Sequence, residues 1–378
     1  MTWKLFEGNG TPKPDDYWPK PEDDKKNPLP PPPTWRDFSD QKVMDQRRGK
    51  TFQIPKDDKI IKLINAALYL RRPLLVEGPP GSGKSSLAYA VAYELGLREV
   101  LKWSITTRST LTEGLYYYDA IGRLRDTQLL NKNSLPNTSN QHNQETNLSD
   151  STIENKEDSS QNKQASSASD PIQNIGDYIT LGPLGTAFLP PKEGEALKPR
   201  VLLIDEIDKS DIDLPDDLLQ IFEEGRFEIP ELKRIAKQKS SVEVRTYDQK
   251  IRTIENGFVP CTVFPFVVLT SNSKRDFPPA FLRRCLRIQM KKPERSHLEK
   301  IIEAHFDETI VDKAAPYINE FLGLIEDGNK LAIDQLLNTI FLLTNNNLDE
   351  IDKKQLKAHL LQSLDSSVIS ESEDDSNG

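Results

Sequence analysis

The sequence has little of several residue types on which particular protein classes depend. Its 378 residues include two cysteines, Cys261 and Cys285, which excludes a disulfide scaffold and favours a reducing compartment. Four scattered histidines and two cysteines cannot supply the usual Cys/His cluster of a zinc site. No apolar run approaches the roughly 20 residues that cross a bilayer, and the N-terminus lacks the apolar core of a signal peptide. We therefore expect a cytoplasmic protein with no membrane partner.

Acidic side chains outnumber basic ones. Lys and Arg total 50 and Asp and Glu total 59, which gives a net charge of −9. Phosphate backbones and anionic lipids repel such a chain, so the composition argues against a nucleic-acid partner, although a local basic patch remains compatible with it. The length exceeds what one hydrophobic core serves and predicts two or three domains.

The N-terminal part has the composition of an extended arm. Residues 1–40 are rich in Pro, Lys and Asp and include the run Pro30–Pro33. Such a sequence favours polyproline-like chain with little to bury, and we expect it to be disordered. Trp35 and Phe38 come shortly after the proline run. Their aromatic rings could pin the arm onto a folded body.

Two further stretches lack helical or strand periodicity. Asn, Ser, Gln, Asp and Glu dominate from about 131 to 174, and residues 366–378 are acidic and rich in Ser. Both compositions predict disorder, as an internal insertion and as a tail. The remaining chain divides into two folded domains, residues 41–292 and residues 293–365.

The first folded domain alternates strands and helices. Short apolar strands are predicted at residues 74–78, 99–105, 201–205, 264–270 and 285–290. A helix capped by Asp57 precedes the first strand and another follows it, ending at Gly96. Apolar strands separated by helices predict a parallel sheet covered on both faces, the α/β class. From Glu294 onward only helical periodicity remains, which predicts a small all-α domain.

A phosphate-binding signature follows the first strand. The residues are Gly78, Pro79, Pro80, Gly81, Ser82, Gly83, Lys84 and Ser85, with Ser86 opening the next helix. They match G-x-x-x-x-G-K-[ST], in which backbone N–H groups cradle phosphates at the positive end of a helix. We expect Lys84 to reach the β- and γ-phosphates of ATP and Ser85 to bind Mg²⁺. A Gly-rich turn without a ligand is the alternative reading.

A second signature is a buried strand that ends in paired acids. The sequence VLLIDEID places Asp205 and Glu206 directly after four apolar residues. Asp205 is the candidate Mg²⁺ ligand and Glu206 the candidate base that activates the attacking water. Strands also often end in solvated acids with no such role. We expect Asp208 to cap the following turn without a catalytic role.

A third strand ends in Asn272, which is placed to hydrogen-bond the γ-phosphate or the attacking water. Taken alone, Thr270, Ser271 and Asn272 are better explained as residues of a simple turn. Arg283 and Arg284 follow at a helix end. They could complement the helix dipole, or project into the phosphate site of a neighbouring subunit and stabilise transition-state charge.

Taken together, these motifs resemble those of the AAA+ ATPases. Within that family the chain is most similar to the MoxR-like branch. The stretches at residues 106–124, 181–190 and 218–232 add to this likeness. The resemblance implies a P-loop NTPase parallel sheet in order 5-1-4-3-2, flanked by helices and followed by a helical lid. It also implies a ring, usually hexameric, with ATP bound between subunits.

The resemblance also assigns roles. It makes Gly78–Ser85 the Walker A motif, Asp205 and Glu206 the Walker B motif, and Asn272 sensor 1. Arg284 occupies the position most like the arginine finger, with Arg283 as the near alternative. It implies a protein partner that is remodelled by ATP hydrolysis, of a kind that often bears a von Willebrand factor A domain.

One departure concerns the lid. Members of the family often carry an arginine, sensor 2, near the start of a lid helix, and here the corresponding stretch offers only Lys330. Lysine supplies charge without the planar fork of arginine, which leaves phosphate sensing by the lid open.

Two other functions fit parts of the pattern. A nucleic-acid motor, as in McrB-like GTPases, uses the same motifs, and the acidic balance argues against it. A scaffold that binds nucleotide without useful turnover has no need of Glu206 as a water-activating acid. We therefore expect a Mg²⁺-dependent ATP hydrolase.

Overall fold

The computed structural model describes residues 31–54, 58–133, 175–273, 275–345 and 348–363. Most of the N-terminal arm, nearly all of the insertion and the acidic tail, which were expected to be disordered, lie outside these residues, as does Asp57. Of the arm, residues 31–40 are described. They include a 3-10 helix, η1 (Thr34–Arg36), which holds Trp35.

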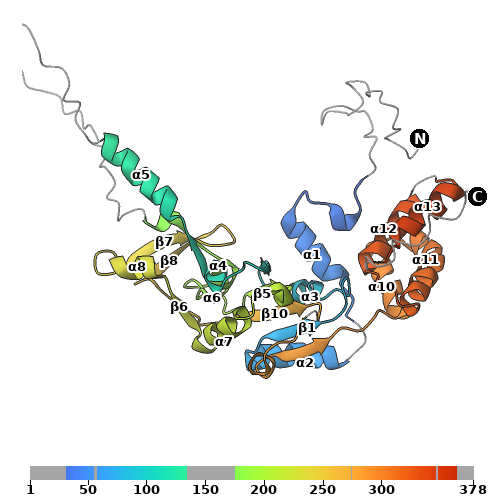
Figure 1. Cartoon of the computed structure of the whole chain (residues 1–378), viewed down its shortest axis with the longest axis horizontal. Coiled ribbons are helices and arrows are strands. Elements are labelled where there is room, and N and C mark those ends of the chain that lie inside the picture. The colour runs from blue at the N-terminus through green and yellow to red at the C-terminus, as the bar shows by residue number, and fades with distance from the viewer. Residues whose placement is uncertain (1–30, 55–57, 134–174, 274, 346–347, 364–378) are drawn as a thin grey trace, which may run out of the picture.

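Five parallel strands form the first sheet, which lies at the centre of the molecule (Figure 1). From edge to edge these are β11 (Leu286–Gln289), β1 (Leu74–Glu77), β10 (Phe266–Ser271), β5 (Val201–Asp205) and β2 (Leu101–Ser104). Numbered along the chain, this order is 5-1-4-3-2, as the sequence resemblance implied. The apolar residues of β1, β5 and β10 are buried along the whole strand, which is typical of a parallel sheet covered on both faces.

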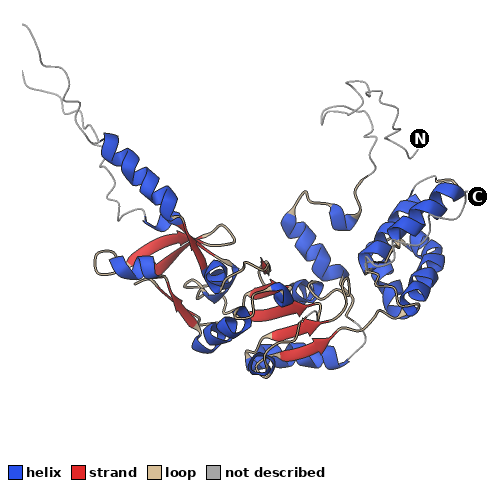
Figure 2. Ribbon diagram, in the orientation of Figure 1, coloured by secondary structure: helices blue, strands red, loops and turns tan. Residues whose placement is uncertain are grey.

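Helices cover both faces of this sheet (Figure 2). On one face lie α1 (Gln41–Thr51), α2 (Asp58–Leu70) and α3 (Ser86–Glu94), of which α2 and α3 supply much of one buried cluster. On the other lie α4 (Leu111–Leu115), α6 (Pro183–Phe188) and α7 (Leu214–Glu224), which contribute to a second cluster. Leu75, Leu202 and Leu269 face the second cluster, whereas Leu74, Leu203 and Val268 face the first. This alternation follows from the two-residue period of a strand.

A second sheet of six strands was not predicted from the sequence. Its order is β3 (Tyr116–Tyr118), β4 (Ile179–Leu181), β7 (Ser241–Arg245), β8 (Ile251–Glu255), β9 (Phe258–Pro260) and β6 (Arg226–Glu228). Its flanking helices are α5 (Ala120–Asn133), η2 (Ile175–Tyr178) and α8 (Pro230–Ile235). Helix α5 points away from the rest of the molecule (Figure 1).

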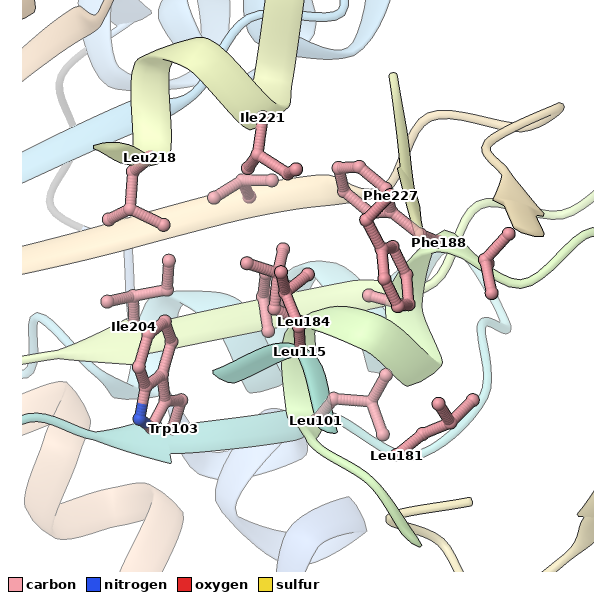
Figure 3. Packing of buried hydrophobic residues seen from close by; sticks show 14 of the residues in the cluster. Leu101, Trp103, Leu115, Leu181, Leu184, Phe188, Ile204, Leu218, Ile221 and Phe227 are labelled. Atoms are coloured by element: carbon pink, nitrogen blue, oxygen red, sulfur yellow. The ribbon is translucent and has the colours of Figure 1, made fainter. Parts of the chain in front are cut away.

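One hydrophobic cluster joins the two sheets. Figure 3 shows Leu184 between Ile204 of the first sheet and the rings of Phe188 and Phe227, and all four belong to one buried cluster. Residues of β7, β8 and β9 belong to the same cluster. The second sheet is therefore packed on the first through a shared core.

The last part of the chain is helical, as predicted. It comprises α10 (Arg295–His305), α11 (Glu308–Glu326), α12 (Ile333–Asn345) and α13 (Glu350–Leu360), which pack around their own buried cluster. The N-terminal Trp35 packs against this cluster, so the prediction that it pins the arm is confirmed, whereas Phe38 is 69% exposed. Among the described helices, none has both the length and the apolar character needed to cross a bilayer.

Candidate functional site

The loop Gly78–Ser85 joins β1 to α3 at the carboxyl end of the first sheet. Gly81 and Gly83 adopt left-handed backbone conformations, with φ of 70° and 82°. A Cβ atom at Gly81 would lie 2.3 Å from the Cβ of Ala332, and one at Gly83 would lie 2.6 Å from the ring of Phe52. Both positions therefore require glycine for their conformation and for the close approach of neighbouring segments.

Lys84 is buried at the centre of this loop. Its ammonium group donates hydrogen bonds to the carbonyl oxygens of Gly78 (3.0 Å) and Pro79 (2.8 Å) and to Oδ1 of Asn272 (2.9 Å). Burial lowers the pKa of Lys84, and the negative charges of Asp208, Asp205 and Glu206 partly oppose this effect. The sequence-predicted Lys84 and Asn272 are thus in direct contact, although 188 residues separate them.

Asp205, at the end of β5, accepts three side-chain contacts. Its Oδ1 accepts hydrogen bonds from Oγ of Ser85 (2.6 Å) and Oγ1 of Thr270 (2.7 Å), and its Oδ2 pairs with Nζ of Lys102 (3.0 Å). Burial disfavours the ionised carboxylate, but these three contacts outweigh it and hold the pKa of Asp205 below its ordinary value. The two candidate metal ligands, Ser85 and Asp205, are therefore adjacent.

Glu206 follows in a left-handed backbone conformation, with φ of 63° and ψ of 48°. Its backbone N–H donates to Oγ1 of Thr270 (2.8 Å), and its Oε1 accepts from Nδ2 of Asn272 (3.3 Å). Its Oε2 pairs with Lys209 (2.5 Å), and the side chain is 41% exposed. Left-handed backbone in a non-glycine residue is strained, and here the surrounding hydrogen bonds hold it. The carboxylate thus lies between Asn272 and solvent.

Thr270 and Lys102 complete the network, and sequence reasoning missed both. Thr270 had been considered only as a turn former, but it lies in β10, and its hydroxyl contacts both Asp205 and Glu206. Its position is explained by the pairing of Leu269 with Ile204, which brings the ends of β10 and β5 together. Lys102 lies on β2, the neighbour of β5 on the other side.

The prediction for Asp208 is wrong. Its carboxylate is buried and accepts no hydrogen bond from the described residues, so it does not cap the turn η3 (Ile207–Lys209). Instead its charge acts on Lys84. Burial of an unpaired carboxylate is costly, and the positive charges of Lys84 and Lys209 act to offset that cost.

Arg283 and Arg284 do not join this network within one chain. They follow the short helix α9 (Pro279–Leu282). Arg284 pairs with Glu223 of α7 and donates to the carbonyl oxygen of Ala280 (3.3 Å). Arg283 is exposed, and among the described residues none pairs with its side chain. Arg283 is therefore the less constrained of the two.

Three cavities surround the loop. One of about 620 Å³ is lined by the loop, Asn272 and two lysines, Lys292 and Lys330. The other two, of about 400 and 380 Å³, share Ser82, His297 and Ile333, so they meet between the loop and the C-terminal helices. Lys292 was not predicted, because its relation to the loop depends on how the C-terminal helices pack.

The residues present fit a magnesium nucleotide. Glycine conformations that expose backbone N–H groups, a lysine and a helix start form an anion cradle, and Ser85 and Asp205 offer hard oxygen ligands beside it. Within the described chain, no three His, Cys, Asp or Glu side chains gather into a metal-binding group. A cation at Asp205 would therefore need phosphate oxygens and water as its remaining ligands, which is the usual arrangement for Mg²⁺.

Comparison with known proteins agrees with this geometry. A family profile described as AAA domain (dynein-related subfamily) matches residues 73–285, which is 213 of 378 residues and more than half of the chain. The matched region contains the phosphate-binding loop, Asp205, Glu206 and Asn272. A search of curated proteins found no match. The motifs, the sheet order and the profile lead to one conclusion: the chain belongs to the AAA domain family, in its dynein-related subfamily.

Proposed function

We propose that this protein is a Mg²⁺-dependent ATPase that hydrolyses ATP in an oligomeric ring, usually a hexamer in this family, and uses the energy to remodel a protein partner. The observation that carries the proposal is a single hydrogen-bonded network, in which Thr270 joins two sets of contacts. The network contains Lys84, Ser85, Asp205, Glu206, Thr270 and Asn272. The ends of two neighbouring strands, β5 and β10, and the loop after β1 contribute to it. The dynein-related AAA domain family supports nucleotide-dependent activity, and the MoxR-like likeness in sequence supports the remodelling role.

In this proposal each side chain has a positional or electrostatic role. Backbone N–H groups of residues 81–85 and the Lys84 ammonium hold the phosphates, while Ser85 and Asp205 hold the magnesium ion. The ion supplies charge neutralisation at the phosphates when it is bound. Glu206 accepts a hydrogen bond from Asn272, which orients its carboxylate toward an attacking water. Phosphoryl transfer needs little covalent chemistry, so positioning and charge account for the rate.

The nucleotide base has room between the loop and the C-terminal helices, which we propose to be the lid. The joined cavities of about 400 and 380 Å³ lie there and include apolar side chains such as Ile54, Phe52 and Ile333. Lys292 and Lys330 line the third cavity with the loop and Asn272. We propose that these two lysines replace the missing sensor 2 arginine as cations near the phosphates.

Replacement of Glu206 by glutamine tests the hydrolysis. We expect Glu206→Gln to bind ATP as the wild type does and to lose turnover by about a hundredfold or more, because the amide cannot accept the proton of water. ATP binding and phosphate release are measured on the same samples. Glu255→Gln is the matched control, since Glu255 lies on β8 and bonds Ser241. Retained turnover in Glu206→Gln would remove Glu206 from this role and would favour a scaffold or another base.

A ring would need an arginine from the neighbouring subunit, and the two candidates can be separated. Since Glu223 holds Arg284, Arg283 is the more available, whereas the sequence position favours Arg284. We expect turnover per subunit to rise with protein concentration and to fall about a thousandfold when the acting arginine becomes alanine. Arg283→Ala and Arg284→Ala are compared at equal concentration. Turnover that is independent of concentration and of both arginines would contradict the ring.

A protein that bears a von Willebrand factor A domain is the partner that the MoxR-like resemblance suggests. The nucleic-acid motor remains the rival, and salt-dependent binding to DNA at the net charge of −9 would be evidence for it.

A further inference from the structure

An N-terminal segment, residues 34–51, contacts both the C-terminal helices and helix α3 of the first domain. The proposed ATP hydrolysis assigns no role to this segment. At one end, Nε1 of Trp35 donates to Oδ1 of Asn338 on α12 (3.1 Å). The indole ring also lies edge-on to His305, Phe306 and Phe341, with ring centroids 5.7, 5.5 and 5.9 Å apart. Edge-to-face contacts of this kind stabilise packing beyond the buried area alone. Trp35 is therefore anchored among the C-terminal helices.

At its other end, the segment packs on the helix that follows the phosphate-binding loop. Gly49 of α1 approaches α3 so closely that a Cβ there would lie 2.5 Å from the carbonyl oxygen of Tyr89. Arg48 donates through Nε to Oγ of Ser86 (3.0 Å), and its guanidinium carbon lies 4.4 Å from the centroid of the Tyr89 ring. Ser86 directly follows Ser85. The core end of the segment is thus fixed one residue from the candidate metal ligand.

The part between these anchors is internally braced. Arg47 donates to the carbonyl oxygen of Thr34 (2.8 Å) and pairs with Asp37 (3.8 Å). Asp40 caps α1 by accepting from the backbone N–H groups of Lys42 and Val43. The two ends of the segment are therefore linked by side-chain contacts as well as by the chain.

The segment also forms a wall of the cavity beside the loop. The cavity of about 380 Å³ is lined by Trp35, Arg48 and Phe52 on one side, by Gly81 and Gly83 of the loop, and by α10 and α12. In Figure 1, α1 lies above α3 and beside the C-terminal helices. Movement of the C-terminal helices away from the loop would require that Trp35 leave its site, that α1 leave α3, or that the contacts of Arg47 between them break.

We propose that residues 34–51 are a strap that holds the C-terminal helices over the bound nucleotide, and that Trp35 is the positioning residue that sets how fast nucleotide leaves. This deepens the proposed function and rests on it for the identity of the ligand. Loss of the indole frees the helices to move, so nucleotide dissociates faster. Because the strap acts through position, its effect falls on dissociation and less on the chemical step.

Dissociation of a fluorescent ADP analogue from the full-length protein tests the strap. We expect Trp35→Ala to speed dissociation about tenfold or more. Trp35→Phe keeps the ring contacts and loses the hydrogen bond to Asn338. Its dissociation rate should therefore lie between those of the wild type and Trp35→Ala. Arg48→Ala releases the other end and should also speed dissociation. Val43→Ala is the matched control, because Val43 lies in the same helix with 46% of its surface exposed and faces neither anchor.

Hydrogen exchange of α10 and α12 without nucleotide gives a second readout that does not depend on the ligand. We expect faster exchange in Trp35→Ala and in Arg48→Ala than in Val43→Ala. Unchanged exchange in both variants would overturn the strap. Faster exchange with a dissociation rate within twofold of the wild type would overturn its control of nucleotide release. Absence of any nucleotide binding in the wild type would instead refute the proposed function, while exchange would still decide whether the strap holds the helices.

Discussion

The two sheets of this protein are built on different principles. In the first, β1, β5 and β10 are buried on both faces, and polar residues appear only where strands end. In the second, β7 alternates buried Val242 and Val244 with exposed neighbours, so one face packs on the core and the other meets solvent. A sheet covered on both faces can present functional side chains to solvent only where its strands end. The candidate site lies at the carboxyl ends of the strands. The second sheet instead serves as a support that shares the core.

The largest expected effect tests whether the two sheets unfold together. Val244 is 1% exposed and lies in the cluster that joins the sheets. We expect Val244→Asp to destabilise the protein by about 3 to 5 kcal/mol, because it buries an unpaired charge. Chemical unfolding, followed both by circular dichroism and by nucleotide binding, should give one shifted transition.

Ile251→Asp is the control for this change. Ile251 lies on the neighbouring strand with 49% of its surface exposed, so the same aspartate should cost less than about 1 kcal/mol there. Two separate transitions in Val244→Asp would mean that the sheets are independent units.

The next prediction tests whether Lys84 binds the phosphates of ATP. We expect Lys84→Met to weaken ATP binding about a hundredfold, because the phosphates lose their buried ammonium partner. The unfolding midpoint should also fall, because two carbonyl oxygens lose a donor and the buried carboxylate of Asp208 loses a nearby cation. Equilibrium binding and thermal unfolding measure the two quantities. Lys198→Met is the control. Lys198 also donates to a carbonyl oxygen, that of Gly96 (3.0 Å), but it is exposed and does not belong to the candidate site. Equal binding by Lys84→Met and wild type would contradict the proposed site.

The smallest effect concerns the link between the sheets at Asp248. Burial alone would raise the pKa of Asp248, but hydrogen bonds from Thr246 and Lys250 and the charge of Arg200 lower it to about 2. Arg200 directly precedes β5, so this carboxylate ties the hairpin of the second sheet to the first.

A pKa depressed in the folded state stabilises the protein above the unfolded value of 3.8, and this stability is lost as the pH falls toward 2. We expect Asp248→Asn to lower stability by about 1 kcal/mol at pH 6, and the difference from the wild type to shrink to about half at pH 3. Urea unfolding at both pH values measures it. A difference that does not change with pH would show that the charge of Asp248 is not involved.

The sequence predicted the first sheet well and the second hardly at all. Strands such as residues 201–205 are continuous apolar runs and are visible without any partner. By contrast β3, β4, β6 and β9 are three residues long, too short for a periodic signal. Among the described strands of this sheet, β7 carries the clearest periodic pattern. Val242 and Val244 alternate there with polar residues, and a polar turn leads on to β8.

Within the site, residues that belong to motifs were found and residues that depend on pairing were not. Lys84, Asp205 and Glu206 lie in recognisable local patterns. Lys102 and Thr270 act because β2 and β10 flank β5, an order that local spacing does not reveal. The opposite error was made for Asp208, for which a local cap was expected and a buried charge beside Lys84 was found.

Helix α5 has a practical consequence for protein engineering. The chain leaves the fold along α5 and returns at η2, and the two are held together by Tyr178, whose hydroxyl donates to Asp126 (2.8 Å) and whose carbonyl accepts from Asp119 (2.8 Å). From Asp126 to Asn133 the helix carries the chain roughly 10 Å outward at 1.5 Å per residue. Because closing a longer connection costs only about 0.6 kcal/mol per doubling of its length, the interval 134–174 is the place to insert a fluorescent or affinity module. A reporter joined after Asn133 would follow the outer end of α5, away from both sheets.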